Sequence, residues 1–251
     1  MRNILITGAS GGLVREMVPL LTDDFLILLG RDKEKLEQLY ARHANKLVFE
    51  TDIQDEAALR ELLSQLEQRI GTIDILVNNA GYGRFADFSD FSSQEVRQMF
   101  EINTLALMTL SRLVGEQMKK EQKGQIINIV SMAGLIASSK SSVYSATKFA
   151  AIGFSNALRL ELAPSNVVVT TVNPGPIATA FFNQADPDGT YLASVKPFLL
   201  QPNIVARKIV KVMGTRRREL NLPWTLAVAH KCYTLFPRLA DFLARTVFNY
   251  K

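Results

Sequence analysis

Short apolar runs of strand length alternate with longer amphipathic stretches along most of the chain. The apolar runs predict six buried strands, at Asn3–Thr7, Phe25–Leu29, Leu47–Thr51, Ile73–Asn78, Gln125–Ser131 and Val167–Asn173. Four longer stretches have helical spacing, namely Lys33–His43, Glu56–Ile70, Ser93–Glu121 and Ser142–Ala163. Asp55 and Ser93 are expected to cap the second and third of these helices. This alternation predicts an α/β fold with a doubly wound, mostly parallel sheet and helices on both faces.

The segment after the sixth strand departs from this alternation. Prolines and glycines spread over residues 174–200 predict an irregular stretch, and such stretches in α/β domains are often active-site lids. Residues 216–222 then predict a last edge strand, which brings the sheet to seven strands. No internal repeat or low-complexity linker interrupts the chain, so residues 1–251 are expected to form a single domain.

The composition is that of an ordinary globular protein. Of the 251 residues, 47% are hydrophobic and 21% are charged, which suits one domain with a well-buried core. The N-terminus shows no signal-peptide pattern, and no apolar run reaches the roughly 18 residues that span a bilayer. The single cysteine, Cys232, cannot form an internal disulfide. We therefore expect a cytoplasmic protein.

The C-terminal end carries the basic charge. Residues 207–251 hold ten Lys and Arg and two acids, a net charge of +8, so the rest of the +5 chain carries −3. Residues 223–251 form an apolar, basic C-terminal extension. Its large side chains are Trp224, Leu226, Val228, Tyr233, Leu235, Phe236, Leu239, Phe242, Leu243, Val247 and Phe248.

Three interpretations of this extension stay open. It can cover the substrate mouth as a lid, lie buried in a subunit interface, or touch an anionic membrane surface through residues 216–251. The last draws on Arg216, Arg217 and Arg218, which shortly precede Trp224 as in an interfacial anchor. Nucleic-acid binding is disfavoured, because the extension is too apolar for a surface that follows phosphates.

Residues suited to a nucleotide follow the first two strands, and doubly wound sheets bind ligands beyond the carboxyl ends of their strands. Gly8, Gly11 and Gly12 lie between the first strand and a helix, where backbone N–H groups can approach a pyrophosphate. After the second strand, Arg31 can pair with the 2′-phosphate of NADP(H), which we favour. Asp32 keeps NAD(H) as the alternative.

Polar residues also follow the third and fourth strands. Asp52 can accept a hydrogen bond from an adenine amine, or cap the next helix. Asn78 and Asn79 precede Ala80 and Gly81, and the pair suits strand locking and cofactor contact equally well.

A second group of residues carries acid–base chemistry. Ser131 ends the fifth predicted strand, and Tyr144 and Lys148 open the following helix. Residues four apart share a helix face, so the phenol and the ammonium can lie side by side. A neighbouring cation is expected to lower the pKa of a tyrosine, as a general acid/base requires.

These residues, in this order, resemble the short-chain dehydrogenase/reductase family, over residues 3 to about 180. The matching landmarks are Thr7-Gly8 to Gly12, Asp52, Asn78-Asn79-Ala80-Gly81, Asn103, Ser131, Tyr144 with Lys148, and Asn173-Pro174-Gly175-Pro176-Ile177-Ala178-Thr179. The resemblance implies a Rossmann-like fold and hydride exchange between NADP(H) and a carbonyl or alcohol carbon.

The resemblance also implies a role for each site residue. Tyr144 would give or take the proton, and Lys148 would tune it and bind the nicotinamide ribose. Ser131 would hold the substrate oxygen, and Asn103 would position a water of the proton relay. The cofactor would be bound by Gly8, Ser10, Gly11, Gly12, Leu13, Arg31, Asp52, Ile53, Asn79, Ala80, Gly81, Tyr144, Lys148, Pro174, Gly175, Ile177 and Thr179.

One residue departs from the family pattern. Val14 stands where the glycine motif usually has its third glycine, which permits close helix–strand packing. A branched side chain there is expected to push the helix away or to crowd the cofactor.

The substrate side is predicted to be apolar. Phe85, Met132, Ile136, Val143, Phe181 and Phe182 follow strand ends or lie in the stretch 174–200. They favour an apolar, lipid-like ketone, aldehyde or secondary alcohol. The resemblance further implies a homodimer or homotetramer built on the helices at 93–121 and 142–163.

Three other functions fit the sequence less well. A serine hydrolase is disfavoured because Ser131 lies in no Gly-x-Ser-x-Gly elbow. No His and Cys cluster suggests a metal site. The alternative from another class is a non-catalytic NADP(H)-binding sensor or scaffold, which only Val14 supports.

Overall fold

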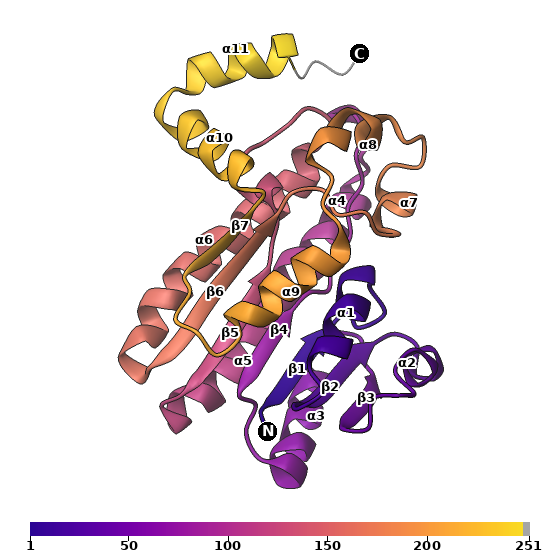
Figure 1. Ribbon diagram of the computed structural model, residues 1–251, viewed down its shortest axis with the longest axis vertical. Helices are drawn as coiled ribbons and strands as arrows, with labels where there is room; N and C mark the ends of the chain where they lie inside the picture. Colours follow the sequence, from indigo (N-terminus) through magenta and orange to yellow (C-terminus); the bar gives the residue numbers. More distant parts are fainter. Residues whose placement is uncertain (248–251) are drawn as a thin grey trace.

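A computed structural model of the chain describes residues 1–247, leaving aside the side chains of residues 194 and 243–247. Seven parallel strands form one sheet in the order β3-β2-β1-β4-β5-β6-β7 (Figure 1). Their bounds are β1 Asn3–Thr7, β2 Phe25–Gly30, β3 Lys46–Glu50, β4 Ile75–Asn78, β5 Gly124–Ile129, β6 Val167–Pro174 and β7 Glu219–Leu222. The predicted doubly wound sheet is confirmed, and its strand order reverses between β1 and β4.

Helices cover both faces of the sheet (Figure 1). Their bounds are α1 Gly12–Met17, α2 Lys33–Leu39, α3 Glu56–Ile70, α4 Ser93–Phe100, α5 Ala106–Glu121, α6 Ser142–Leu162, α7 Phe181–Ala185, α8 Thr190–Val195, α9 Pro202–Val212, α10 Trp224–Leu235 and α11 Pro237–Val247. Alternate strand residues serve the two faces: Ile4 and Ile6 pack with α1 and α9, while Leu5 packs with α3 and α5. Strands buried on both faces explain why the predicted strands read as unbroken apolar runs.

The third predicted helix, Ser93–Glu121, is two helices. A π-helical turn, Glu101–Leu105, joins α4 to α5. The N-cap of α4 is Ser92 and not Ser93: the Ser92 side chain accepts from the backbone of Glu95, whose carboxylate accepts from Ser92 in return. Asp55 caps α3 as predicted, through the backbone N–H of Ala58.

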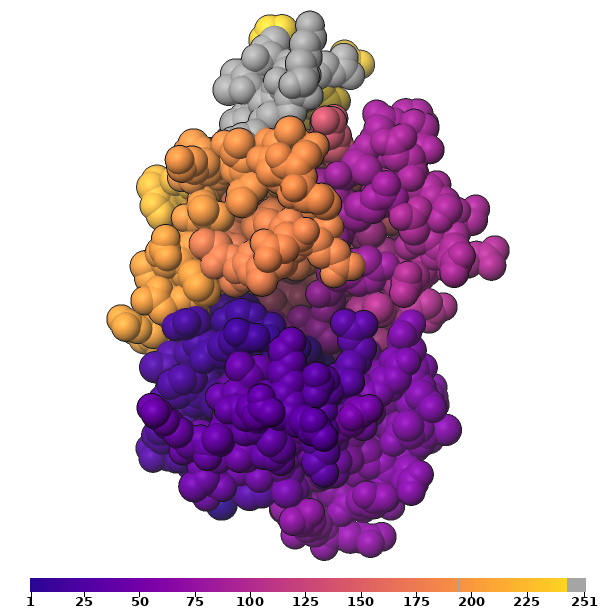
Figure 2. Space-filling model, turned by 90° about the vertical axis from the view of Figure 1, so that its right-hand side faces the viewer, coloured from indigo at the N-terminus to yellow at the C-terminus, as the bar shows by residue number. Residues whose placement is uncertain are grey.

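Residues 174–200, the lid segment, are less irregular than predicted. They contain the short helices α7 and α8 between β6 and α9. On the face shown in Figure 2, the lid segment, in orange, lies above the N-terminal part of the chain, in indigo. An isolated parallel bridge between Ile177 and Leu200 closes the two ends of the lid segment onto each other.

The three arginines of the predicted membrane anchor are separated from Trp224 by β7. They precede the strand, whereas α10 begins after it, and all three bond to the protein itself. Arg216 donates to Asn166, Arg217 to the Glu219 carbonyl oxygen, and Arg218 to Glu219 and Asn156. The interpretation that these arginines and Trp224 form one anchor stays a prediction.

The C-terminal extension folds as α10 and α11, which project beyond the carboxyl end of β7 (Figure 1). Phe248, and the side chains of Leu243 and Val247, lie outside the described residues. No helix within residues 1–247 is both long and apolar enough to cross a membrane.

Candidate active site

A cavity of about 1290 Å³ lies beyond the carboxyl ends of the strands, where the strand order reverses between β1 and β4. The lid segment, the turns after β1, β2, β4 and β5, and the helices α10 and α11 surround it. Its volume exceeds the roughly 300–1,000 Å³ of an ordinary small-molecule pocket. The cavity therefore has room for a cofactor together with a second molecule.

All seventeen residues predicted to bind a cofactor line this one cavity. The backbone approaches most closely at the glycine turn. Gly8 has φ +63°, and a Cβ there would lie 2.8 Å from the Cα of Ala80. A Cβ on Gly12 would lie 2.9 Å from Cγ2 of Thr179. Gly8 therefore needs glycine, and a side chain at position 12 would require Thr179 to move.

The turn after β4 is bonded to the turn after β1. The Thr7 hydroxyl accepts from the backbone N–H groups of Asn79 and Ala80, at 3.0 Å each. The Asn79 amide donates back to the carbonyl oxygens of Thr7 and Gly8. Asn78 instead points into the fold, where its amide donates to Ser111 and Asn128. Asn78 thus locks strands, while Asn79 lines the cavity.

The polar residues after β2 and β3 divide their roles. The Asp32 side chain accepts from the backbone N–H of Lys35 and caps α2. Arg31 is exposed at the cavity wall and makes no ion pair among the described residues. Asp52 accepts from Gln54 in a tight turn, whereas Asp55 caps the following helix. Arg31 and Asp52 therefore face the cavity, while the Asp32 carboxylate is used by its own helix.

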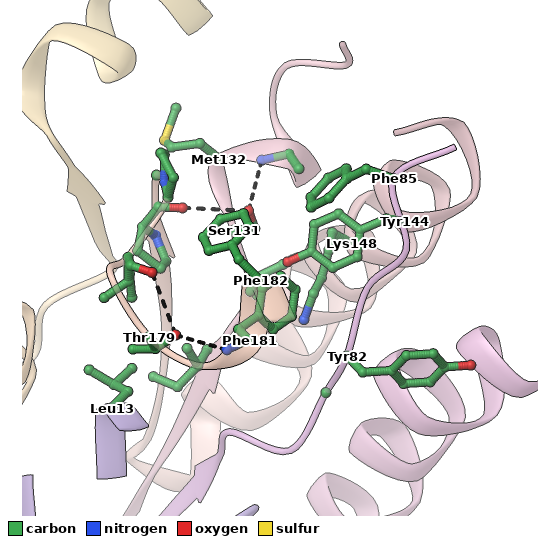
Figure 3. A pocket seen from close by; sticks show the side chains of 18 of the residues that line it. Leu13, Tyr82, Phe85, Ser131, Met132, Tyr144, Lys148, Thr179, Phe181 and Phe182 are labelled. Carbon is green, nitrogen blue, oxygen red and sulfur yellow. Dashed lines mark hydrogen bonds between the residues drawn. The ribbon is translucent and has the colours of Figure 1, made fainter. Parts of the chain in front are cut away.

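Ser131, Tyr144 and Lys148 point into the same cavity (Figure 3). Ser131 follows β5, and its hydroxyl accepts from the backbone N–H of Ala133 at 3.0 Å. Tyr144 and Lys148 lie on the first two turns of α6, whose backbone at Lys148 packs against Gly134. A Cβ on Gly134 would lie 2.7 Å from the Lys148 carbonyl oxygen, so this glycine sets the distance between the α6 helix and Ser131's turn.

Burial dominates the acid–base properties of the pair. It raises the pKa of Tyr144, and a hydrogen bond with Ser131 lowers that pKa by less. Burial also lowers the pKa of Lys148 to about 8. The Lys148 Nζ lies 5.7 Å from the Tyr144 ring centroid, and burial outweighs the effect of this cation on the pKa of the phenol. The prediction that the neighbouring cation lowers the pKa of this tyrosine is wrong, because burial raises it.

Asn103 does not line the cavity. It lies in the π-helical turn, 1% exposed, and its amide donates to the Tyr82 carbonyl oxygen at 2.8 Å and to the Thr147 hydroxyl. Its amide oxygen accepts from the Tyr82 N–H. A Cβ on Gly81 would lie 3.0 Å from that oxygen and 3.4 Å from the Lys148 Nζ. Asn103 thus holds the segment after β4, at Gly81 and Tyr82, next to Lys148.

Val14 lies in the hydrophobic core and not at the cavity. Its side chain is fully buried among residues of β1, α1 and α9, while its neighbours Gly12 and Leu13 line the cavity. Val14 therefore does not line the cavity, because the helix turns its side chain towards the core.

Aromatic rings form the substrate side of the cavity. Phe85 stacks on Tyr191 of α8, with centroids 3.9 Å apart, and meets the Tyr144 ring edge-on at 5.6 Å. The backbone N–H of Phe85 also donates to the Ala185 carbonyl oxygen at 2.8 Å. Five of the six predicted apolar residues line the cavity, and Val143 does not. Figure 3 shows four of the five, Phe85, Met132, Phe181 and Phe182.

Sequence reasoning missed part of this wall. The missed lining residues come from α8, the segment after it and the C-terminal helices: Tyr191, Val195, Phe198, Ala229, Cys232 and Asp241. A lid is one of the three interpretations of the extension, and the inner face of the extension does border the cavity. For the C-terminal helices the sequence did contain a signal, because Leu226, Ala229 and Tyr233 are spaced to lie on one face of a helix.

The fold and this cavity define a class of α/β proteins that bind a ligand at the reversal point of a doubly wound sheet. A model of the short-chain dehydrogenase family matches residues 2–189. The chain therefore belongs to the short-chain dehydrogenase/reductase family of oxidoreductases.

Individual relatives agree with this assignment. The chain is 33% identical over 196 residues to a probable short-chain type dehydrogenase/reductase of Helicobacter pylori, covering 76% of this chain and 72% of that protein. It is 31% identical over 178 residues to the 3-ketodihydrosphingosine reductase of Bacteroides thetaiotaomicron, covering 71% and 65%. A solved short-chain dehydrogenase from Streptomyces avermitilis superposes with a TM-score of 0.82 at 26% identity, covering 98% and 97%.

Proposed function

We propose that the protein transfers hydride between NADP(H) and the carbonyl or secondary alcohol carbon of an apolar substrate. The observation that carries this proposal is the placement of Ser131, Tyr144 and Lys148 in the cavity that also contains the glycine turn. The reaction class is oxidation or reduction at CH–OH and C=O groups, with NADP as the acceptor in oxidation.

The cavity fits a dinucleotide. Gly8 and Gly12 allow the turn before α1 to lie against Ala80 and Thr179, and this turn lines the cavity at the point where α1 begins. Gly8, Ser10, Gly12 and Leu13 would then hold the pyrophosphate side, and Asp52 and Ile53 the adenine side. Asn79, Ala80, Gly81, Pro174, Gly175, Ile177 and Thr179 would line the ribose and nicotinamide side. When bound, the cofactor supplies or accepts the hydride.

The chain itself supplies the proton. Burial keeps the Tyr144 phenol protonated, so in the reductive direction it is a proton donor to the substrate oxygen. The Ser131 hydroxyl, bonded to Tyr144, orients that oxygen and stabilises the charge that the departing proton leaves on the phenol. Lys148, protonated below its pKa of about 8, stabilises the same charge. Asn103 holds the segment after β4 in place near Lys148.

We propose NADP(H) over NAD(H). The Arg31 guanidinium stands at the cavity wall with no carboxylate paired to it in residues 1–247, and it suits a 2′-phosphate. The Asp32 carboxylate, which would favour the ribose 2′-OH of NAD, is committed to capping α2. NAD(H) remains the weaker alternative.

The substrate is proposed to be an apolar, lipid-like ketone, aldehyde or secondary alcohol. Phe85, Met132 and Ile136 make the wall beside Tyr144 apolar. The name of the Bacteroides relative, a 3-ketodihydrosphingosine reductase, supports a ketone on a long-chain lipid.

Assembly and location complete the proposal. We expect a homodimer or homotetramer that assembles through α4, α5 and α6. Exposed apolar side chains support this expectation: Phe149 and Leu160 lie on α6, and Leu105 lies in the turn before α5. We expect a cytoplasmic protein whose C-terminal helices also touch an anionic membrane surface, because Trp224 is 73% exposed there and no acid lies between residues 219 and 241. Light scattering tests the first, and co-sedimentation with phosphatidylglycerol vesicles the second.

The direct test is a fluorescence titration with NADPH and NADH, followed by a panel of apolar ketones. Wild type should bind NADPH more tightly than NADH and reduce at least one ketone. Tyr144→Phe should still bind NADPH but lose turnover. If Tyr144→Phe turns over as wild type does, or if no ketone is reduced, the enzyme proposal fails and the non-catalytic sensor or scaffold takes its place. Val14, which favoured that alternative in the sequence, lies in the core.

A further inference from the structure

The helix α10 presents a continuous stripe to the cavity. Leu226, Ala229 and Tyr233 follow the spacing i, i+3 and i+7 and line the cavity, as does Phe236, the first residue after the helix. At 1.5 Å per residue the helical part of the stripe is ~10 Å long. Leu239 of α11 continues the wall beyond it.

This stripe begins beside the reaction centre. A Cβ on Gly175 would lie 3.0 Å from Cδ1 of Leu226, so α10 touches the turn that follows β6. The ring nitrogen Nδ1 of His230 lies 3.1 Å from the Leu135 carbonyl oxygen, which fixes α10 against the segment after Ser131. The stripe therefore leads outward from the Ser131 and Tyr144 side of the cavity.

The stripe is apolar surface that the protein does not cover. Phe236 is 60% exposed and Leu239 is 56% exposed although both line the cavity. Within the described residues, the only cations that line the cavity are Arg31, at its cofactor end, and Lys148, beside Tyr144. Among the described residues that line the outer end, Asp241 is the only charged one. A neutral chain suits such a wall, and a chain that ends in a carboxylate does not.

We propose that the inner face of α10 and α11 binds the unbranched alkyl or acyl chain of the substrate, whose reacting carbonyl lies at Ser131 and Tyr144. This inference rests on the proposed function and adds the substrate class: a neutral ketone or secondary alcohol on a medium or long chain. The cavity volume allows for a cofactor and such a chain at once.

The experiment compares kcat/KM for butan-2-one and decan-2-one with NADPH. Decan-2-one has about six methylenes more than butan-2-one, and a buried methylene contributes about 4-fold, so burial of half of them should favour decan-2-one by about 60-fold. Ala229→Phe places a ring in the stripe and should reduce this ratio to below about 5-fold. Val228→Phe, the matched control on the opposite face of α10, should keep the wild-type ratio. A wild-type ratio near one, or equal ratios in both variants, overturns the proposal.

A second comparison tests the outer end. 9-Oxodecanoate should react about 2- to 5-fold less efficiently than decan-2-one because of Asp241, and Asp241→Asn should remove that difference. An unchanged difference in Asp241→Asn contradicts the placement of the chain end.

The proposed binding site for the alkyl chain, called the chain site, and the proposed ketone reduction can be tested separately. If butan-2-one is reduced in a Tyr144-dependent way without any chain-length effect, the chain site fails and the proposed function stands. If no ketone is reduced, calorimetry with decan-2-ol decides on the chain site alone. Binding that Ala229→Phe weakens supports it, and absence of binding overturns it.

Discussion

The Tyr40 hydroxyl donates a 2.5 Å hydrogen bond to the carbonyl oxygen of Ala9, in the middle of the glycine turn. Tyr40 lies at the end of α2 and is 5% exposed, and burial raises its pKa to about 12. The phenol therefore remains a hydrogen-bond donor at all working pH values. Through this bond, α2, which begins just after Arg31, supports the turn that approaches the cofactor.

Tyr40→Phe should weaken NADPH binding. The change removes the donor and leaves the buried Ala9 carbonyl oxygen without its partner, which costs about 1–3 kcal/mol. We expect a several-fold rise in the Kd for NADPH in fluorescence titrations, with a smaller loss of thermal stability. An unchanged Kd would mean that the turn keeps its shape without this bond.

Lys148→Met should stabilise the protein while it removes turnover. The pKa of Lys148 is about 8 in the fold and 10.5 in a free side chain, so below pH 8 the fold carries a buried charge at a cost of about 3 kcal/mol. The unfolded chain binds more protons between pH 8 and 10.5, so wild-type stability should rise with pH across that window. The gain from Lys148→Met should be largest below pH 8 and fade towards 10.5 in urea unfolding. A destabilised variant at pH 7 would contradict this.

The rate of reduction should depend on the same titration. Below pH 8 Lys148 is protonated and can stabilise the charge on Tyr144, and above it this cation is lost. We expect kcat/KM for ketone reduction to be level below pH 8 and to fall about tenfold per pH unit above it. Tyr144 contributes no fall in this range, because burial raises its pKa. A profile that is flat to pH 10 would exclude Lys148 as the titrating group.

Val14→Gly should destabilise the fold and leave the cavity intact. It restores the glycine usual in the family, yet it removes a fully buried side chain from the core and adds glycine to a helix. Together these cost about 2–4 kcal/mol. The Kd for NADPH, measured well below the melting temperature, should change less than about 2-fold. A large gain in affinity would show that Val14 does crowd the cofactor.

Arg31→Ala should reduce the preference for NADPH. The guanidinium is proposed to pair with the 2′-phosphate, and a charge-assisted hydrogen bond contributes about 1.5–3 kcal/mol. The Kd for NADPH should rise by about 10-fold or more, while the Kd for NADH should stay within about 2-fold. Equal losses for both nucleotides would assign Arg31 to another part of the cofactor.

The sheet and the cavity wall could be predicted because both rest on local patterns. Strands such as β1 and β2 are buried on both faces, so they read as apolar runs, and parallel pairing brings the residues after each strand to one edge. That rule, applied to the sequence alone, brings Arg31, Asn79 and Ser131 to one cavity, which they do line.

The remaining features depend on contacts that local patterns do not contain. Helical periodicity continues through Ser93–Glu121, so it could not reveal the extra residue of the π-helical turn that buries Asn103. A six-residue helix such as α8 is too short for a periodic signal. The raised pKa of Tyr144 could not be predicted, because its burial depends on Phe85 and the lid segment, which are distant in the sequence.

The lid segment and Tyr144, the proposed proton donor, share a neighbour in the Phe85 ring, which stacks on Tyr191 and touches Tyr144. Next to Phe85, the lid segment is held by the stack of Phe85 on Tyr191 and by the hydrogen bond from the Phe85 N–H to the Ala185 carbonyl oxygen, and not by a β-ladder. In the proposed reaction, release of product would therefore require the lid segment to move away from Phe85. The same movement would expose the Tyr144 phenol to solvent, so that the residence time of the product and the re-protonation of Tyr144 would be governed by one event.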